Sequence, residues 1–230
     1  MGGYGIRTNR VRSYMLEIEE EEVPLAELDL SNHFAYIIGY EDGTVRPENN
    51  ITRAEVATIF FRLLTQNSRT ELWKMTNSFP DVRDEGWYNN AISTLTNGGI
   101  LTGYPDGTFK PSATITRAEL ATIAVRFVFN GSLDSFPPNL PTFSDISGHW
   151  AENYIRLACE LGYVNGYPDG SFRPNQPITR AEVATLLNNV LNRHVETKDD
   201  LLDGMKTWVD NVEGKWYYLA VQEALMLTLL

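Results

Sequence analysis

The chain reads GYPDGSFRPNQPITRAE at residues 166–182, and two further copies of this stretch lie upstream. The copies are GYPDGTFKPSATITRAE at 103–119 and GYEDGTVRPENNITRAE at 39–55. Their starts lie 63 and 64 residues apart (166 − 103 and 103 − 39). A fixed period of this length is typical of repeat architectures. The sequence therefore predicts three related structural units.

Each copy encodes a turn followed by a capped helix. Asp-Gly favours a tight turn because glycine tolerates a positive φ, and the proline after the basic residue restrains the chain to an extended path. Thr-Arg-Ala-Glu is a capping box, in which threonine and glutamate bond each other's backbone N–H groups, and such a cap is worth about 1 kcal/mol. Apolar residues then recur at steps of three and four, which predicts a helix. The predicted core faces are Val56, Ile59, Phe60, Leu63 and Leu64; Leu120, Ile123, Ala124, Phe127 and Val128; and Val183, Leu186, Leu187, Val190 and Leu191.

A second motif, with an aspartate followed by a tryptophan, precedes two of the turns. It reads FPDV at 79–82 with Trp87, and FSDI at 143–146 with Trp150. Apolar spacing predicts a leading helix that includes each tryptophan and ends at the glycines near 98 and 162. The first unit has only a remnant of this motif, whereas a third copy occurs in segment 208–230 with Trp216. We hypothesise that 208–226 packs against the first unit.

Composition excludes several classes of function. With 43% hydrophobic residues the chain has enough apolar material for a core. A net charge of −11 argues against general nucleic-acid binding, which needs a basic face. No run approaches the roughly 20 apolar residues of a membrane span. No apolar segment follows Arg12, so no signal peptide is visible in this chain.

The sequence offers little for catalysis or metal binding. Cys159 is the single cysteine, which rules out an intrachain disulfide, and its apolar neighbours favour a small buried core residue. His33, His149 and His194 share no ligand spacing, and each turn has too few acidic residues for a calcium loop. No nucleophile elbow or Walker loop occurs, whereas a catalytic pair of carboxylates stays open as an alternative, since no motif marks such a pair. We expect no enzyme activity, no metal site and no cofactor.

One residue of the capping motif is not explained by helix formation. An arginine in the first turn opposes the helix dipole, at a cost of about 0.3–1 kcal/mol when exposed. One explanation is an anion site, where helix N–H groups and a guanidinium bind a carboxylate. The other, favoured from the residues alone, is a salt bridge to the aspartate of the same turn, and the two are compatible. The pairs would be Arg53 with Asp42, Arg117 with Asp106, and Arg180 with Asp169.

The order of these motifs resembles the S-layer homology domain family. The match is fullest over residues 143–182, nearly as full in the second unit, and restricted to the second half of the first, covering about 28–230 in all. The resemblance implies an all-α fold, a pseudo-threefold bundle of three helix-turn-helix modules with long loops. The modules would be 28–72, which lacks most of its leading helix, 73–136 and 137–195. They would be preceded by a disordered leader, 1–27, and followed by a half-module, 196–230, that completes the first.

The resemblance also implies a function. Such modules hold exported proteins non-covalently at the bacterial cell wall or S-layer, so an extracellular location is expected. Their ligand is a secondary cell wall polysaccharide linked to peptidoglycan and often bearing a ketal-linked pyruvate. Its carboxylate would meet the motif arginines, Arg53, Arg117 and Arg180. The alternative is the anchoring portion of a larger wall-associated glycoside hydrolase or other exported enzyme, and in either case a cargo protein is implied.

Aromatic residues are the candidate platform for the sugar. They are the leading-motif tryptophans, Trp87, Trp150 and Trp216, and the turn tyrosines, Tyr40, Tyr104 and Tyr167. Core packing is the favoured interpretation for the tryptophans, because large aromatic residues dominate protein cores. For the tyrosines both interpretations stay open.

Overall fold

The computed structural model describes residues 26–30, 35–193, 195–201 and 205–225. Within these ranges the chain forms seven α-helices, one short 3-10 helix and no β-strand, so the predicted helical class is confirmed. The helices are α2 (Arg53–Leu63), α3 (Gln66–Leu72), α4 (Asn89–Asn97), α5 (Arg117–Val128), α6 (Glu152–Glu160), α7 (Arg180–Val190), η1 (Lys198–Asp200) and α8 (Tyr218–Ala224).

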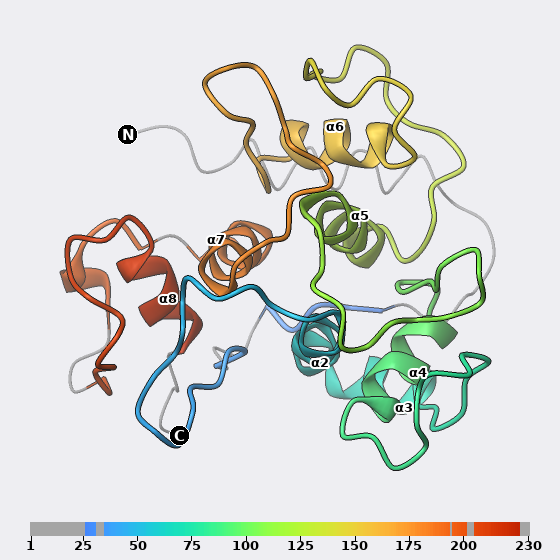
Figure 1. Cartoon of the computed structure of the whole chain (residues 1–230), viewed down its shortest axis with the longest axis horizontal. Coiled ribbons are helices and arrows are strands. Elements are labelled where there is room, and N and C mark those ends of the chain that lie inside the picture. Colours follow the sequence, from blue (N-terminus) through green and yellow to red (C-terminus); the bar gives the residue numbers. More distant parts are fainter. Residues whose placement is uncertain (1–25, 31–34, 194, 202–204, 226–230) are drawn as a thin grey trace.

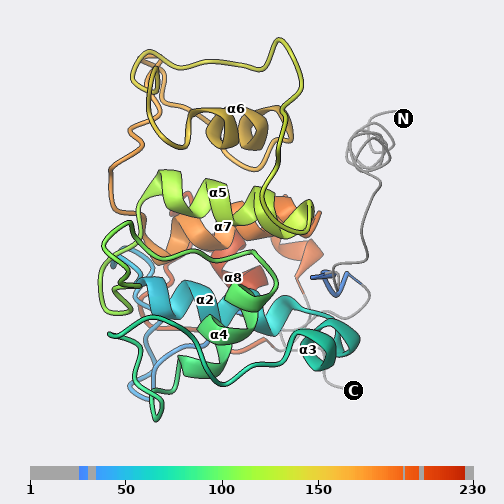
Figure 2. The ribbon, with the colours of Figure 1, turned by 90° about the vertical axis from the view of Figure 1, so that its right-hand side faces the viewer.

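The three capped helices form the centre of the molecule. α2, α5 and α7 begin directly after Thr52, Thr116 and Thr179, and each has the complete capping box that the sequence predicts. Figure 1 shows these helices nearly end-on around a common centre, with α4, α6 and α8 further out. Figure 2 shows them from the side. α4 packs on α2, α6 on α5 and α8 on α7, so each central helix has one outer partner.

The segments before the central helices are joined in a closed cycle. The Ile51 N–H donates to the Ile178 carbonyl, the Ile178 N–H to the Ile115 carbonyl, and the Ile115 N–H to the Ile51 carbonyl, at 3.2, 3.0 and 3.1 Å. All three side chains are buried. Burial of these hydrogen bonds strengthens them and makes an unpaired group costly, so the cycle holds the starts of α2, α5 and α7 together.

The leading helices begin later than the sequence predicts. α4, α6 and α8 each start two residues after the motif tryptophan, which therefore lies outside the helical periodicity. Trp87, Trp150 and Trp216 are 65, 62 and 67% exposed, so the prediction that they pack in the core is wrong. The following residue takes the inward position instead, most clearly at Ala151 and Tyr217, which are buried.

The C-terminal segment contacts the first unit through a pattern of hydrogen bonds that recurs in the other two units. Asp210 accepts the N–H groups of Val45 and Arg46 at 2.8 and 2.7 Å. Asp81 and Asp145 make the same two bonds in the other units, to Phe109 and Lys110 and to Phe172 and Arg173, at the same distances. The N–H groups of Tyr36 and Ile37 donate to the Ala224 carbonyl.

The predictions for the two chain ends concern residues that the structure describes only in part. Most of the predicted leader, residues 1–25, lies outside them, as do residues 226–230 of the apolar C-terminus. Ala26 is buried, and the Glu27 backbone bonds Ser68 and Thr65. Cys159 is half-buried rather than buried, and partial burial raises the pKa of its thiol.

Candidate functional site: grooves between the repeated units

Each motif arginine reaches into the next unit rather than into its own turn. The Arg53 guanidinium donates from Nε to the Phe109 carbonyl, from Nη1 to Glu119 Oε1 and from Nη2 to the Thr102 carbonyl, at 2.8, 2.6 and 3.2 Å. Only 6% of Arg53 is exposed. Three nitrogens of one side chain thus bond two positions in the loop between α4 and α5 and the first turn of α5 itself.

The other two motif arginines make the same contacts around the molecule. Arg117 donates to the carbonyls of Phe172 and Asn165 and to Glu182. Arg180 donates to the carbonyls of Val45 and Ile38 and to Glu55. The predicted intramolecular salt bridge therefore exists, but the predicted partners are wrong. The turn aspartates pair instead with the basic residue four positions on, in Asp42–Arg46, Asp106–Lys110 and Asp169–Arg173. Hydrogen bonds from residues of the turn lower the pKa of each aspartate to about 2.

The capping glutamates connect helix capping to these contacts between units. Glu119 Oε2 accepts the Thr116 N–H at 2.8 Å, which completes the cap of α5. Its Oε1 accepts both Arg53 Nη1 and the Tyr104 hydroxyl at 2.6 Å. Burial, followed by the bond to Glu119, raises the pKa of Tyr104 to about 12. The hydroxyl therefore stays protonated and keeps donating to the carboxylate.

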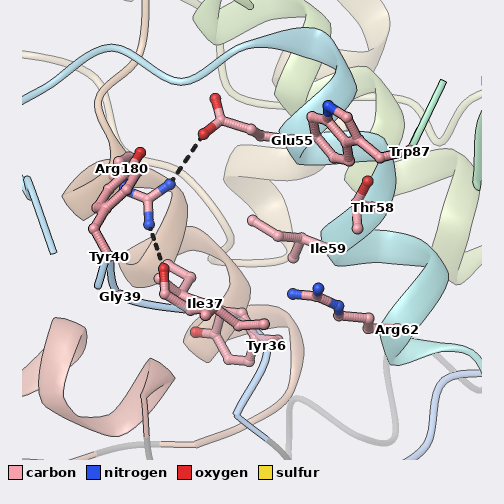
Figure 3. A pocket seen from close by; sticks show the side chains of 11 residues that line it. Tyr36, Ile37, Gly39, Tyr40, Glu55, Thr58, Ile59, Arg62, Trp87 and Arg180 are labelled. Atoms are coloured by element: carbon pink, nitrogen blue, oxygen red, sulfur yellow. Dashed lines mark hydrogen bonds and ion pairs between the residues drawn. The ribbon is translucent and has the colours of Figure 1, made fainter. Parts of the chain in front are cut away.

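A groove of about 250 Å³ lies beside Arg180 (Figure 3). Three different units supply its walls: Arg180 comes from the third, Tyr40 and Glu55 from the first, and Trp87 from the leading motif of the second. Figure 3 shows Arg180 bonded to Glu55 on one side of the groove and Trp87 on the other. The groove also contains Arg62, from the last turn of α2.

A larger groove of about 530 Å³ lies beside Arg53 and has the same construction. Its walls include Tyr104 and Glu119 of the second unit and Trp150 of the leading motif of the third. Arg126, from the last turn of α5, lies in it at the place that Arg62 takes in the first groove. Volumes of several hundred cubic ångströms suit a small ligand.

The nine candidate residues thus sort into three sets, each with an arginine, a tyrosine and a tryptophan from different units. Arg180 with Tyr40 and Trp87, and Arg53 with Tyr104 and Trp150, line the two grooves. The third set is Arg117, Tyr167 and Trp216, in which the Arg117 guanidinium lies 5.0 Å from the Tyr167 ring centre. Trp216 occupies the matching sequence position.

Arg62 and Arg126 are groove residues that the motif analysis missed. Both lie nine residues after the motif arginine of their own helix, outside the motif. A position-by-position comparison of the three copies could have found them. The position nine residues after the motif arginine holds Arg62 in the first copy, Arg126 in the second and Asn189 in the third. Among the described residues, no cluster of three or more His, Cys, Asp or Glu side chains is arranged to hold a metal ion. None of the described helices is long and apolar enough to cross a membrane.

Comparison with known proteins gives the family. The profile of the S-layer homology domain matches residues 35–57, 78–121 and 142–184. Cell surface glycoprotein 1 of Acetivibrio thermocellus is 42% identical over 168 residues, which are 70% of this chain and 7% of that protein. The Cellulosome-anchoring protein of the same organism is 39% identical over 178 residues, 77% of this chain and 40% of that protein. An Amylopullulanase of Thermoanaerobacterium thermosulfurigenes is 34% identical over 160 residues, 67% of this chain and 8% of that enzyme.

The aligned region is less than half the length of each of these relatives. The three profile matches contain the three copies of the turn and the capped starts of α2, α5 and α7, and they end at residues 57, 121 and 184, before the middle of each helix. The chain therefore belongs to the S-layer homology domain family, of which it carries three copies.

Proposed function

We propose that this chain anchors a protein non-covalently to the bacterial cell wall by binding a pyruvylated secondary cell wall polysaccharide in the grooves between its units. The observation that carries the proposal is the repeated construction of the two grooves. Each combines a motif arginine at a helix N-terminus, a turn tyrosine and an exposed tryptophan from three different units. This combination suits an acidic sugar, because aromatic faces pack on sugar rings while guanidinium groups bind carboxylates.

The proposal includes a pseudo-threefold bundle of modules 28–72, 73–136 and 137–195, with segment 196–230 completing the first. Two observations support it. The Ile51, Ile115 and Ile178 backbones form a closed cycle of hydrogen bonds. Asp210 bonds the first turn as Asp81 and Asp145 bond the other two. In such a bundle every groove lies at a junction between modules, so binding depends on the complete assembly.

The chain itself is a binding module rather than a catalyst in this proposal. The polypeptide that contains it would be located outside the cell at the wall or S-layer, and other segments would supply its activity. The relatives named a cellulosome-anchoring protein and an amylopullulanase favour an anchor that occurs in proteins of different activities. Incubation with wall glycans tests this point, because release of new reducing ends would contradict a purely non-catalytic role.

The decisive test is co-sedimentation with purified wall sacculi. We expect the chain to sediment with sacculi that retain the secondary polymer and to stay in the supernatant once the polymer is extracted. Chemical removal of the pyruvate ketal by mild acid separates the acidic group from the rest of the polymer. Equal sedimentation with extracted and intact sacculi would contradict the proposal.

A further inference from the structure

We propose that Asn165, through its bond to Gly166, is a site of spontaneous deamidation, and that the isoaspartyl product weakens the junction between the second and third units. The inference goes beyond wall anchoring and does not depend on it. It comes from a comparison of the three Asn-Gly steps of the chain, which begin at Asn97, Asn130 and Asn165.

The reaction needs only the chain, water and a base in solution. The base removes the proton of the Gly166 backbone nitrogen, which attacks the Asn165 side-chain carbonyl carbon. A C–N bond forms, and the side-chain amide group takes up a proton and leaves as ammonia. Water then opens the cyclic imide at one of its two carbonyl carbons. One product is aspartate. The other is isoaspartate, in which the chain runs through the side-chain carbon and the former backbone carbonyl becomes a free carboxylate.

Asn165 leaves both reacting groups available. The residue is exposed and lies outside the helices. Across the described residues, no hydrogen bond engages its side chain or the Gly166 N–H, although Arg117 Nη2 donates to its backbone carbonyl at 2.9 Å. Glycine has no Cβ to crowd the attacking nitrogen. The two groups can therefore meet without local unfolding.

The other two Asn-Gly steps are held by helix ends. The Gly98 N–H, after Asn97, donates at 3.1 Å to a carbonyl in the last turn of α4. The Gly131 N–H, after Asn130, donates at 2.8 Å to a carbonyl in the last turn of α5, and both glycines are buried. Each N–H has to leave its acceptor before it can attack, so reaction at these steps requires local opening.

The Asp-Gly steps of the three turns, which could form the same imide, are also held. The N–H groups of Gly43, Gly107 and Gly170 each donate to the carbonyl three residues earlier. Each turn aspartate accepts the N–H and the hydroxyl of the residue two positions on. Cyclisation would break all of these bonds, which leaves Asn165 as the reactive step.

The glycine of this step is required by packing, whereas the residue before it varies. A Cβ at Gly39, Gly103 or Gly166 would lie 2.0, 2.4 or 2.2 Å from an aromatic ring. The preceding residue is Ile38 in the first copy and Thr102 in the second. Neither side chain can form the imide, so the third unit alone has a reactive step at this position.

The isoaspartyl product changes the contact with Arg117. Its carboxylate is the former carbonyl that accepts Nη2, so a full negative charge replaces a neutral acceptor. This carboxylate competes for the guanidinium with Glu182, which accepts Nη1 at 3.4 Å, because charge-assisted bonds are the stronger ones. The added chain atom also displaces Gly166, where the Phe143 ring leaves no room. Both changes weaken the junction between the two units.

The test is incubation of the intact chain in mildly alkaline buffer, followed by tryptic peptide mapping. Trypsin cleaves after Arg126 and Arg156, so the three Asn-Gly steps fall in separate peptides, and the mass gain on conversion of an amide to an acid identifies each product. We expect Asn165 to react at least about tenfold faster than Asn97 or Asn130, because those steps must first open locally. In concentrated urea the three rates should agree within about threefold, since no folded structure protects any of them.

Two variants separate the site from its effect on stability. Asn165→Thr introduces the residue of the second copy and should abolish the early product. Freshly purified Asn165→Asp reproduces the aspartyl product without lengthening the chain, and it should melt like the wild type. In aged wild type, the fraction labelled by an isoaspartyl methyltransferase should melt about 2–4 °C lower, as expected when one contact is lost in a chain of this length.

Three results would overturn the inference. The first is equal reaction rates at Asn97, Asn130 and Asn165 in the folded chain. The second is a rate at Asn165 that rises on unfolding by as much as the other two rates. The third is isoaspartate at Asn165 without any lower-melting fraction.

Discussion

Arg53 is a structural cation, and its loss should destabilise the protein. The side chain is 6% exposed and holds Glu119 and two backbone carbonyls of the second unit. In Arg53→Ala the carboxylate of Glu119 loses its counter-charge in a buried site, which typically costs about 3–5 kcal/mol. We predict a decrease of about 3 kcal/mol in the free energy of unfolding, measured with urea.

Arg62→Gln is the matched comparison in the last turn of the same helix, beside the other groove. No partner among the described residues holds this guanidinium, so the free energy of unfolding should change by no more than about 0.5 kcal/mol. A similar loss in both variants would contradict the distinction between a structural and a free arginine. It follows that reduced polymer binding by Arg53→Ala has to be compared with the folded fraction at the same temperature.

The turn aspartates should make stability depend on pH in the acid range. The pKa values of Asp42, Asp106 and Asp169 fall from 3.8 to about 2, chiefly because of bonds from the hydroxyls of Thr44, Thr108 and Ser171. A lowered folded-state pKa means that the stabilisation is complete above about pH 4 and is lost as the pH falls through about 2. The triple Asp→Asn variant should therefore lose stability at pH 7 and show a flatter decline between pH 4 and pH 2. Urea unfolding at a series of pH values measures this, and an unchanged slope would contradict it.

At the scale of helices, the capping glutamates should differ in importance. Glu119 accepts four bonds, from the Thr116 N–H and hydroxyl, from Arg53 and from the Tyr104 hydroxyl. Glu182 accepts the corresponding pair from Thr179 and one bond from Arg117 at 3.4 Å. Glutamine has only one accepting oxygen, so it leaves more donors unpaired at position 119. We predict losses of about 2 kcal/mol for Glu119→Gln and about 1 kcal/mol for Glu182→Gln.

Chemical denaturation of the two variants side by side measures this difference. Thr116→Ala serves as the control for capping alone, with an expected loss of about 1 kcal/mol. A larger loss in Glu182→Gln than in Glu119→Gln would contradict the order. The prediction concerns the contact of each glutamate with the arginine of the preceding unit, since the caps themselves are the same in both.

What the sequence predicted correctly at this scale was local. Thr116 and Glu119 are three residues apart, so the start of α5 follows from the motif itself. The partner of Arg53 lies 66 residues away, at Glu119, and no local rule selects it over Asp42. The apolar spacing predicts Trp87 on a helix face, but the helix begins two residues later and the indole is exposed. Contacts between repeats therefore decided the features that the sequence analysis missed.

At the scale of the whole molecule, the net charge of the chain and the charge of the two grooves have opposite signs. The chain carries −11, whereas each of the two described grooves carries a small positive charge from its arginines. Attraction to an anionic polymer must then act within the groove, where partly buried pairs are screened less than exposed ones. We predict that raising NaCl from about 0.05 to about 0.5 M weakens polymer binding by less than about tenfold.

Calorimetric titration with soluble polymer at several salt concentrations measures this dependence. Glucosamine-based glycans without acidic groups are the control for binding by the aromatic residues alone. A steep decline with salt would show that many exposed charges contribute, and stronger binding at high salt would show that repulsion by the whole chain dominates.

The last prediction concerns the closure of the molecule by its C-terminal segment. Asp210 bonds the N–H groups of Val45 and Arg46, which lie 165 and 164 residues away. These two donors lose their partner in Asp210→Ala, and each buried or partly buried donor left without an acceptor costs about 1–3 kcal/mol. We predict a decrease of about 2 kcal/mol in the free energy of unfolding, similar to that in Asp81→Ala and Asp145→Ala, since those aspartates make the same bonds.

Deletion of residues 205–230 extends the test from one side chain to the whole segment. The deletion also removes α8 from α7 and the Ala224 carbonyl from Tyr36 and Ile37, next to the groove that contains Arg62. Stability and sedimentation with sacculi should both fall, and more than in Asp210→Ala, because burial of α8 is lost together with the hydrogen bonds. If the deleted chain keeps its melting temperature and its polymer binding, the first module is complete without the segment, and the bundle then closes through the cycle of Ile51, Ile115 and Ile178 alone.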